Sequence, residues 1–126
     1  MSMILIVDDS QDVRGAIRDF VRHWRPSVQV LEAQNGHEGV KLAEKYHPDL
    51  ILMDMSMPRV DGATATSTLK SQDDTGEIPV IGMTADAHFN VYLTMKAEPI
   101  CQAFLYRPFN VTDLFDTIGP LLSAPH

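Results

Sequence analysis

Five short segments rich in apolar residues recur along the chain, and most of them stop abruptly at a polar residue. Short runs that are apolar at nearly every position are typical of strands buried on both faces of a parallel sheet. The second segment alternates more loosely, but its β-branched valines also favour a strand. We therefore predict strands at residues 3–7, 28–33, 50–53, 78–83 and 103–106.

The residues after the first strand take the spacing of an amphipathic helix. Ser10 is the expected N-cap, Asp12 lies favourably in the first turn, and Pro26 stops the helix. Its predicted buried face comprises Val13, Ala16, Ile17, Phe20, Val21 and Trp24.

Four further segments indicate helices. Asn35 and Glu38 have the spacing of a capping box before the second helix, which ends at Pro48. Its predicted buried face comprises Val40, Ala43 and Tyr46 or His47. The other helices are predicted at residues 63–72, within residues 86–97, and at residues 111–122 after a cap at Asn110.

Strands and helices thus alternate along the whole chain. This alternation predicts an α/β fold, a doubly wound parallel sheet of five strands covered by five helices. We expect one domain over residues 1–123 and a frayed tail at residues 124–126. In sheets of this kind, ligands bind outside the carboxyl ends of the strands.

Composition narrows the class of protein. The chain has 126 residues, of which 44% are hydrophobic, which suits a single compact core. A formal charge of -7 argues against direct nucleic-acid binding. The one cysteine, Cys101, excludes an intrachain disulfide, and the apolar run at residues 3–7 is too short to span a membrane. We expect a cytoplasmic protein.

Polar residues stand at the carboxyl ends of four predicted strands: Asp8 and Asp9, Asp54, Thr84, and Arg107. Three carboxylates brought together repel one another, and a fold seldom tolerates this unless a cation neutralises them. Oxygen-only ligands favour a hard ion such as Mg²⁺. Asp9 and Asp54 are candidates for direct ligands of the ion, and Asp8 is a candidate for holding a water bound to it. A backbone carbonyl just after Asp54 could complete the coordination shell.

A carboxylate beside a bound metal ion can act as a covalent nucleophile toward phosphorus, so Asp54 could form an aspartyl phosphate. Phosphoryl transfer depends mostly on positioning and on neutralising the charge of the phosphoryl oxygens. Mg²⁺ would bind one phosphoryl oxygen. The Thr84 hydroxyl could donate a hydrogen bond to a second oxygen, and the Arg107 cation could pair with the third. No general base is needed, because the carboxylate is already ionised.

Four motifs carry a resemblance to a known family. They are Ile6-Val7-Asp8-Asp9-Ser10, Asp49 to Gly62 with Asp54 and Met57-Pro58 inside it, Ile81-Gly-Met-Thr84-Ala85, and Phe104-Leu-Tyr-Arg107-Pro108-Phe109. In this order, and over nearly the whole chain, the sequence resembles the receiver domains of two-component response regulators, chemotaxis regulators included.

The resemblance implies a flavodoxin-like sheet with strand order 2-1-3-4-5. It implies phosphorylation of Asp54, Mg²⁺ bound by Asp8, Asp9, Asp54 and the Ser56 carbonyl, and a switch pair formed by Thr84 and Phe104. The implied donor is a sensor histidine kinase or a histidine phosphotransfer protein. The implied recipient is a downstream protein or a fused effector domain, with homodimerisation as a further option. Such a module is a phosphoacceptor switch with slow autodephosphorylation and is not an enzyme acting on outside substrates.

The sequence departs from the family pattern in two places. The family usually has lysine where this chain has Arg107, and the two cations differ in shape and in hydrogen bonding. Arg107 either pairs with the phosphoryl group or points elsewhere and weakens the switch. Ile100-Cys101 also replaces the usual Gly-Ala step before the fifth strand, which indicates an altered fourth helix.

Plainer interpretations stand beside these. Asp8 and Asp9 could simply be acidic residues at a helix N-terminus, where negative charge is favourable. Arg107 could be a surface cation, and Phe104 could be a core residue. The five histidines share no spacing and indicate solvated side chains rather than metal ligands.

Two other functions compete with the switch. One is a pseudo-receiver, a protein-binding module of the same fold that no longer switches, which Arg107 favours. The other is a phosphatase with an aspartyl-phosphate intermediate. Such enzymes commonly carry a second aspartate two positions after the nucleophile, where this chain has Ser56.

Overall fold

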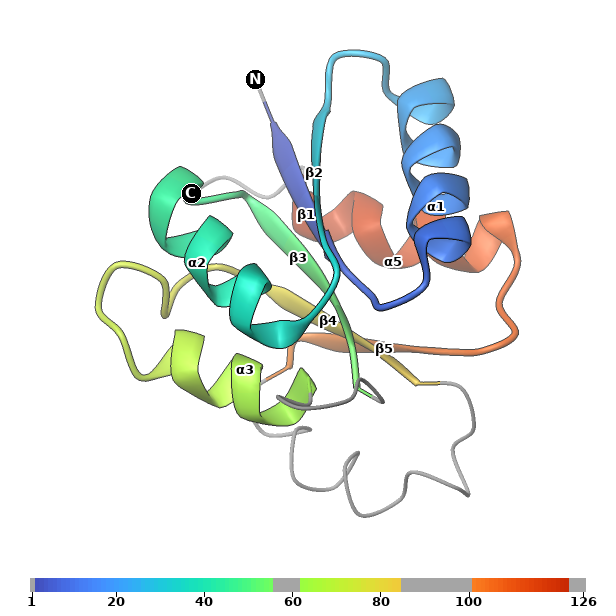
Figure 1. Ribbon diagram of the computed structural model, residues 1–126. Coiled ribbons are helices and arrows are strands. Elements are labelled where there is room, and N and C mark those ends of the chain that lie inside the picture. Colours follow the sequence, from blue (N-terminus) through green and yellow to red (C-terminus); the bar gives the residue numbers. More distant parts are fainter. Residues whose placement is uncertain (1, 56–61, 85–100, 123–126) are drawn as a thin grey trace.

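A computed structural model describes residues 2–55, 62–84 and 101–122 of the chain. A five-stranded sheet lies between two layers of helices (Figure 1). The elements are β1 (Met3–Val7), α1 (Gln11–Trp24), β2 (Gln29–Ala33), α2 (Gly36–Tyr46), β3 (Leu50–Asp54), α3 (Gly62–Lys70), β4 (Val80–Thr84), β5 (Ala103–Tyr106) and α5 (Val111–Leu122).

The sheet has the order β2-β1-β3-β4-β5, and each neighbouring pair is parallel. This confirms the predicted doubly wound, flavodoxin-like architecture. Strand order reverses between β1 and β3, so their carboxyl ends flank the point where such sheets bind ligands. The helix predicted within residues 86–97 lies outside the described residues, as do Ser56 and the tail at residues 124–126.

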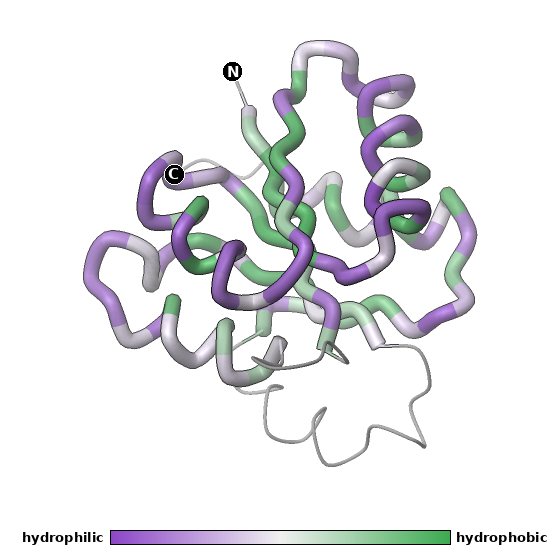
Figure 2. Tube along the Cα trace, in the orientation of Figure 1, coloured by the Kyte–Doolittle hydropathy of each residue, from purple (hydrophilic) through white to green (hydrophobic). Residues whose placement is uncertain are grey.

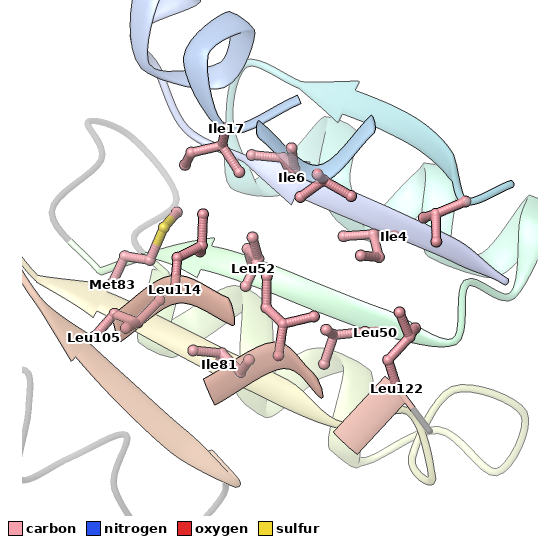
Figure 3. Close-up of a cluster of buried hydrophobic side chains, with 13 residues drawn as sticks. Ile4, Ile6, Ile17, Leu50, Leu52, Ile81, Met83, Leu105, Leu114 and Leu122 are labelled. Carbon is pink, nitrogen blue, oxygen red and sulfur yellow. The ribbon is translucent and has the colours of Figure 1, made fainter. Parts of the chain in front are cut away.

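Two separate hydrophobic layers hold the helices on the sheet. Alternate strand residues such as Leu5 and Ile51 point toward α2 and α3 and form one core with Ala43 and Leu69. The intervening residues point toward α1 and α5 and form the second core (Figure 3). Figure 2 shows the hydrophobic strands in the middle of the molecule and hydrophilic positions along the outer faces of α1 and α2. The predicted burial of β1 and β3 on both faces is confirmed.

The predicted helix caps are confirmed. Ser10 Oγ accepts a hydrogen bond from the Val13 N–H at 3.2 Å, and Asn35 Oδ1 accepts from the Glu38 N–H at 2.8 Å. Asn110 Oδ1 accepts from the Asp113 N–H at 2.8 Å in the same way. Each cap satisfies a backbone donor that has no partner inside its helix, and so fixes where the helix begins.

Two aromatic residues predicted to be buried are exposed. Phe20 is 44% exposed, because α1 meets the sheet along the narrow line of Ile17 and Val21. Tyr46 is 43% exposed and His47 is also exposed, because α2 lies on the sheet through small residues instead. Within the described part of the chain, no helix is long and apolar enough to cross a membrane.

Candidate functional site

The carboxyl ends of β1, β3, β4 and β5 bring the predicted polar residues to one edge of the sheet. Asp8 and Asp9 directly follow β1, Asp54 is the last residue of β3, and Thr84 is the last residue of β4. One carboxylate oxygen from each of Asp8, Asp9 and Asp54 lies within 4.8 Å of the others. Residues from two distant segments of the sequence therefore form one acidic cluster.

Burial divides the three carboxylates into two kinds. Asp8 is 0% exposed and Asp54 is 2% exposed, whereas Asp9 is exposed. A buried carboxylate is costly unless hydrogen bonds or an opposite charge compensate for its lost hydration. Asp8 Oδ1 accepts the Ser10 N–H at 2.9 Å, and Asp8 Oδ2 accepts a hydrogen bond from Arg107 Nη2. The inner part of the cluster is therefore strongly compensated, and Asp9 lies at its solvent-facing side.

Arg107 lies inside the site rather than on the open surface. Its Nη2 is bonded to Asp8, and its Nη1 lies 4.0 Å from Asp54 Oδ2. Its backbone N–H donates to the Thr84 carbonyl at 2.7 Å, which fixes the residue beside β4. The interpretation of Arg107 as a surface cation is wrong, since its side chain is only 22% exposed. Sequence reasoning did not anticipate the pairing with Asp8.

Thr84 and Phe104 lie on neighbouring strands. Thr84 is buried at the end of β4, and Phe104 is half-buried against the core that contains Met55. The Phe104 ring lies directly over Gly82, where a Cβ atom would come within 2.6 Å of Phe104 Cε1. The missing side chain at position 82 thus makes room for the ring. The predicted switch role of the pair stays a prediction.

Gly62 ends the second of the four family motifs, but the sequence alone assigns it no contact with the site. A Cβ atom at this position would lie 2.1 Å from the carbonyl oxygen of Asp54 and 2.9 Å from Met55 Cα. Both neighbours are backbone atoms, which no rotamer change can move away. The start of α3 therefore approaches the Asp54 peptide so closely that only glycine fits there.

Arg14 on α1 contacts the backbone of Asp8 and so supports the acidic cluster. Arg14 Nη1 donates to the Asp8 carbonyl at 2.6 Å, while Arg14 Nε pairs with Glu32 at 3.2 Å. Arg18 Nη1 lies 3.0 Å from the other oxygen of Glu32. Two arginines four positions apart in a helix present their side chains on one face, which is the sequence signal that reveals this support.

Cys101 takes no part in the site. It is partly buried, and burial raises the pKa of its thiol to about 11. Burial also lowers the pKa of the neighbouring Lys70 amine, whose Nζ donates to the Ile78 carbonyl at 2.5 Å. A thiol with so high a pKa stays protonated near neutral pH and is a poor nucleophile. Cys101 instead packs against the core around Leu5 and Ile51 as a small hydrophobic residue.

The comparisons with known proteins agree with this geometry. The response regulator receiver domain family matches residues 4–119, and the chain therefore belongs to that family. It is 32% identical to the polar-differentiation response regulator DivK of Brucella anthropi, with 94% of each chain covered.

Two solved structures are also similar. The receiver domain of a signal transduction histidine kinase from Syntrophus aciditrophicus is 30% identical, with a TM-score of 0.86 and coverage of 98% of this chain and 91% of that one. The receiver domain of the sensor histidine kinase PA1611 from Pseudomonas aeruginosa PAO1 is 26% identical, with a TM-score of 0.88 and 98% coverage of both chains. That structure has a magnesium ion coordinated in its active site cleft.

Proposed function

We propose that the protein is a phosphoacceptor switch of a two-component phosphorelay, in which Asp54 receives a phosphoryl group with the help of Mg²⁺. The observation that carries this proposal is the cluster of Asp8, Asp9 and Asp54, whose oxygens lie within 4.8 Å of one another at the ligand-binding edge of the sheet. Membership of the receiver family supports the same role for Asp54.

The donor set fits Mg²⁺. All three side chains offer hard carboxylate oxygens, and Mg²⁺ binds through one or two carboxylates while it keeps several waters. Asp9 is exposed and would meet an incoming ion first, while Asp8 and Asp54 would hold it from the inside. The Ser56 carbonyl is the further predicted ligand. When bound, the ion would neutralise negative charge on the transferring phosphoryl group.

The chain's own residues supply the rest of the chemistry. An Asp54 carboxylate oxygen attacks the phosphorus of a phosphohistidine, and the phosphorus–nitrogen bond breaks with its electron pair leaving on the imidazole. The Thr84 hydroxyl and the Arg107 guanidinium are the proposed partners of the remaining phosphoryl oxygens. The donor would be a sensor histidine kinase or a histidine phosphotransfer protein.

The proposed output is a change at the surface around β5. The Thr84 hydroxyl moves toward the phosphoryl group and the Phe104 ring repacks inward. Tyr106, whose ring stacks on Phe104 with centroids 6.2 Å apart, is exposed and would sense that movement. A downstream protein, a fused effector domain or a second copy of the chain would read this surface.

The direct test is phosphorylation of the purified protein by acetyl phosphate, followed by intact-mass spectrometry. We expect one phosphoryl group to be added when Mg²⁺ is present and none when EDTA removes the metal. The modification should be lost on treatment with hydroxylamine, which cleaves acyl phosphates. No incorporation under any of these conditions would reject the proposal.

A pseudo-receiver is the second candidate, and the contact between Arg107 and Asp8 is the observation that favours it. A guanidinium held on a metal-binding carboxylate would oppose metal binding. The phosphorylation experiment separates the two candidates, because a pseudo-receiver would take up no phosphoryl group at any Mg²⁺ concentration.

The donor is expected to dock on an apolar groove beside the site. The groove has a volume of about 640 Å³, and Arg107 connects it to the acidic cluster. One wall is α1 with Phe20, and the other is formed by Pro108, Phe109 and Val111. Exposed apolar side chains next to a reactive group are typical of a protein-binding surface.

We therefore expect Phe20→Ala to slow phosphotransfer from a histidine kinase by about tenfold, the loss of a moderate interface contact. Phosphorylation by acetyl phosphate, which needs no docking surface, should not change. The measurement is the rate of phosphotransfer from a panel of autophosphorylated kinases. Tyr46→Ala is the matched control, since Tyr46 is an equally exposed aromatic residue on α2. Equal slowing by both substitutions would contradict the assignment of the groove.

A further inference from the structure

The Arg107 guanidinium faces carboxylates that are proposed to hold a metal ion. It spans the two buried carboxylates of the cluster, with Nη2 on Asp8 and Nη1 at 4.0 Å from Asp54. We infer that Arg107 is a built-in counter-cation: in the metal-free protein it neutralises the site, and a divalent cation must displace it from Asp8 to bind. This inference rests on the proposed metal site and adds an internal competitor to it.

The hydrogen bonds of Asp8 show which oxygen atom Arg107 and a metal ion would compete for. Asp8 Oδ1 is already engaged by the Ser10 N–H at 2.9 Å, an interaction fixed by the start of α1. The other oxygen, Oδ2, is the one held by Arg107. An ion approaching past Asp9 therefore meets an Asp8 whose remaining oxygen faces a positive charge. Metal binding at Asp8 requires that this hydrogen bond be broken.

The shape of the arginine side chain explains why it can act in this way. A guanidinium is a planar fork with several donors, so one side chain can face two carboxylates at once. A lysine ammonium is a compact charge on a flexible stem and engages such a pair less rigidly. The Arg107 fork is further held by its own backbone bond to Thr84 and by a contact of Nη2 with Met83 Sδ at 3.8 Å.

The competition has a consequence for signalling. The apparent affinity for a ligand falls in proportion to the fraction of molecules in which its site is open. Displacement by the metal also releases the guanidinium from Asp8, so metal loading and the availability of Arg107 for a phosphoryl group become one event. The protein would accept a phosphoryl group only at Mg²⁺ concentrations high enough to displace Arg107.

The test is direct titration with Mg²⁺ by calorimetry, without any phosphodonor. Arg107→Lys keeps the charge and removes the fork, and we expect it to bind Mg²⁺ about tenfold more tightly than the wild type, as for a site that is open in roughly one molecule in ten. Arg22→Lys is the matched control: Arg22 is an exposed arginine in the last turn of α1, away from the acidic cluster, and its replacement should leave the affinity unchanged. In the wild type, the NMR signals of the Arg107 guanidinium should shift on addition of Mg²⁺.

The outcomes are separable. Equal affinities for the wild type and Arg107→Lys would overturn the counter-cation and leave the proposed metal site standing. A similar gain in affinity for Arg22→Lys would also overturn it, because the effect would then not depend on the Arg107 fork. Absence of Mg²⁺ binding in every variant would overturn both the counter-cation and the metal site on which it rests.

Discussion

Asp54→Asn is expected to abolish phosphoryl incorporation and, at the same time, to stabilise the metal-free protein. An amide oxygen carries no negative charge and does not attack phosphorus, so the reaction loses its nucleophile. The same change removes one of three clustered negative charges, two of which are buried, while it keeps the shape of the side chain. We expect a gain of about 1 kcal/mol in the free energy of unfolding, an effect of the size common to single substitutions.

Opposite effects on reactivity and stability distinguish a functional carboxylate from a structural one. Asp49→Asn provides the contrast: Asp49 accepts the Met3 N–H at 2.8 Å at the far end of β1, away from the acidic cluster. Its substitution should lower stability and leave phosphorylation by acetyl phosphate intact. The measurements are intact-mass spectrometry and urea denaturation with EDTA present. Phosphorylation of Asp54→Asn at the wild-type level would show that another residue is the acceptor.

The central strands of the sheet could be predicted from sequence because their apolar signal is strong. β1 is apolar throughout and β3 is apolar up to its last residue, Asp54, since a central strand of a parallel sheet is covered on both faces. The acidic cluster followed from the same reasoning, because parallel strands deliver their carboxyl ends to one edge. The resemblance to the receiver family implied the strand order that makes β1 and β3 neighbours and so brings Asp8, Asp9 and Asp54 together, although no pattern in the sequence gives their distances.

The features that the sequence did not predict depend on contacts between distant segments. The pairing of Arg107 with Asp8 joins residues 99 positions apart and depends on how a long side chain is oriented. The exposure of Phe20 depends on the angle at which α1 meets the sheet, and helical spacing alone does not determine that angle. The motif includes Gly62, but the sequence does not show that it lies against the Asp54 backbone, because a turn glycine and a glycine pressed against another backbone look alike.

Gly62→Ala should destabilise the protein strongly, because the start of α3 has no room for a side chain. The added Cβ atom would lie 2.1 Å from the Asp54 carbonyl oxygen, far inside van der Waals contact. Since the opposing atoms belong to the backbone, α3 and the end of β3 must move apart. We expect a loss of about 3 kcal/mol in the free energy of unfolding, at the upper end of the usual cost of overpacking. Urea denaturation followed by circular dichroism measures this loss.

The comparison that isolates this contact is Gly15→Ala on α1. There the added Cβ atom would meet only the Arg18 side chain, at 3.4 Å, and alanine is the better helix former. Gly15→Ala should therefore stabilise the protein by about 0.5 to 1 kcal/mol, opposite in sign to Gly62→Ala. Because the displaced atoms include the Asp54 peptide, Gly62→Ala should also slow phosphorylation by acetyl phosphate under conditions in which the variant is still folded. If Gly62→Ala folds with wild-type stability and reacts at the wild-type rate, the prediction is wrong. The start of α3 would then be able to move away from β3 without displacing Asp54.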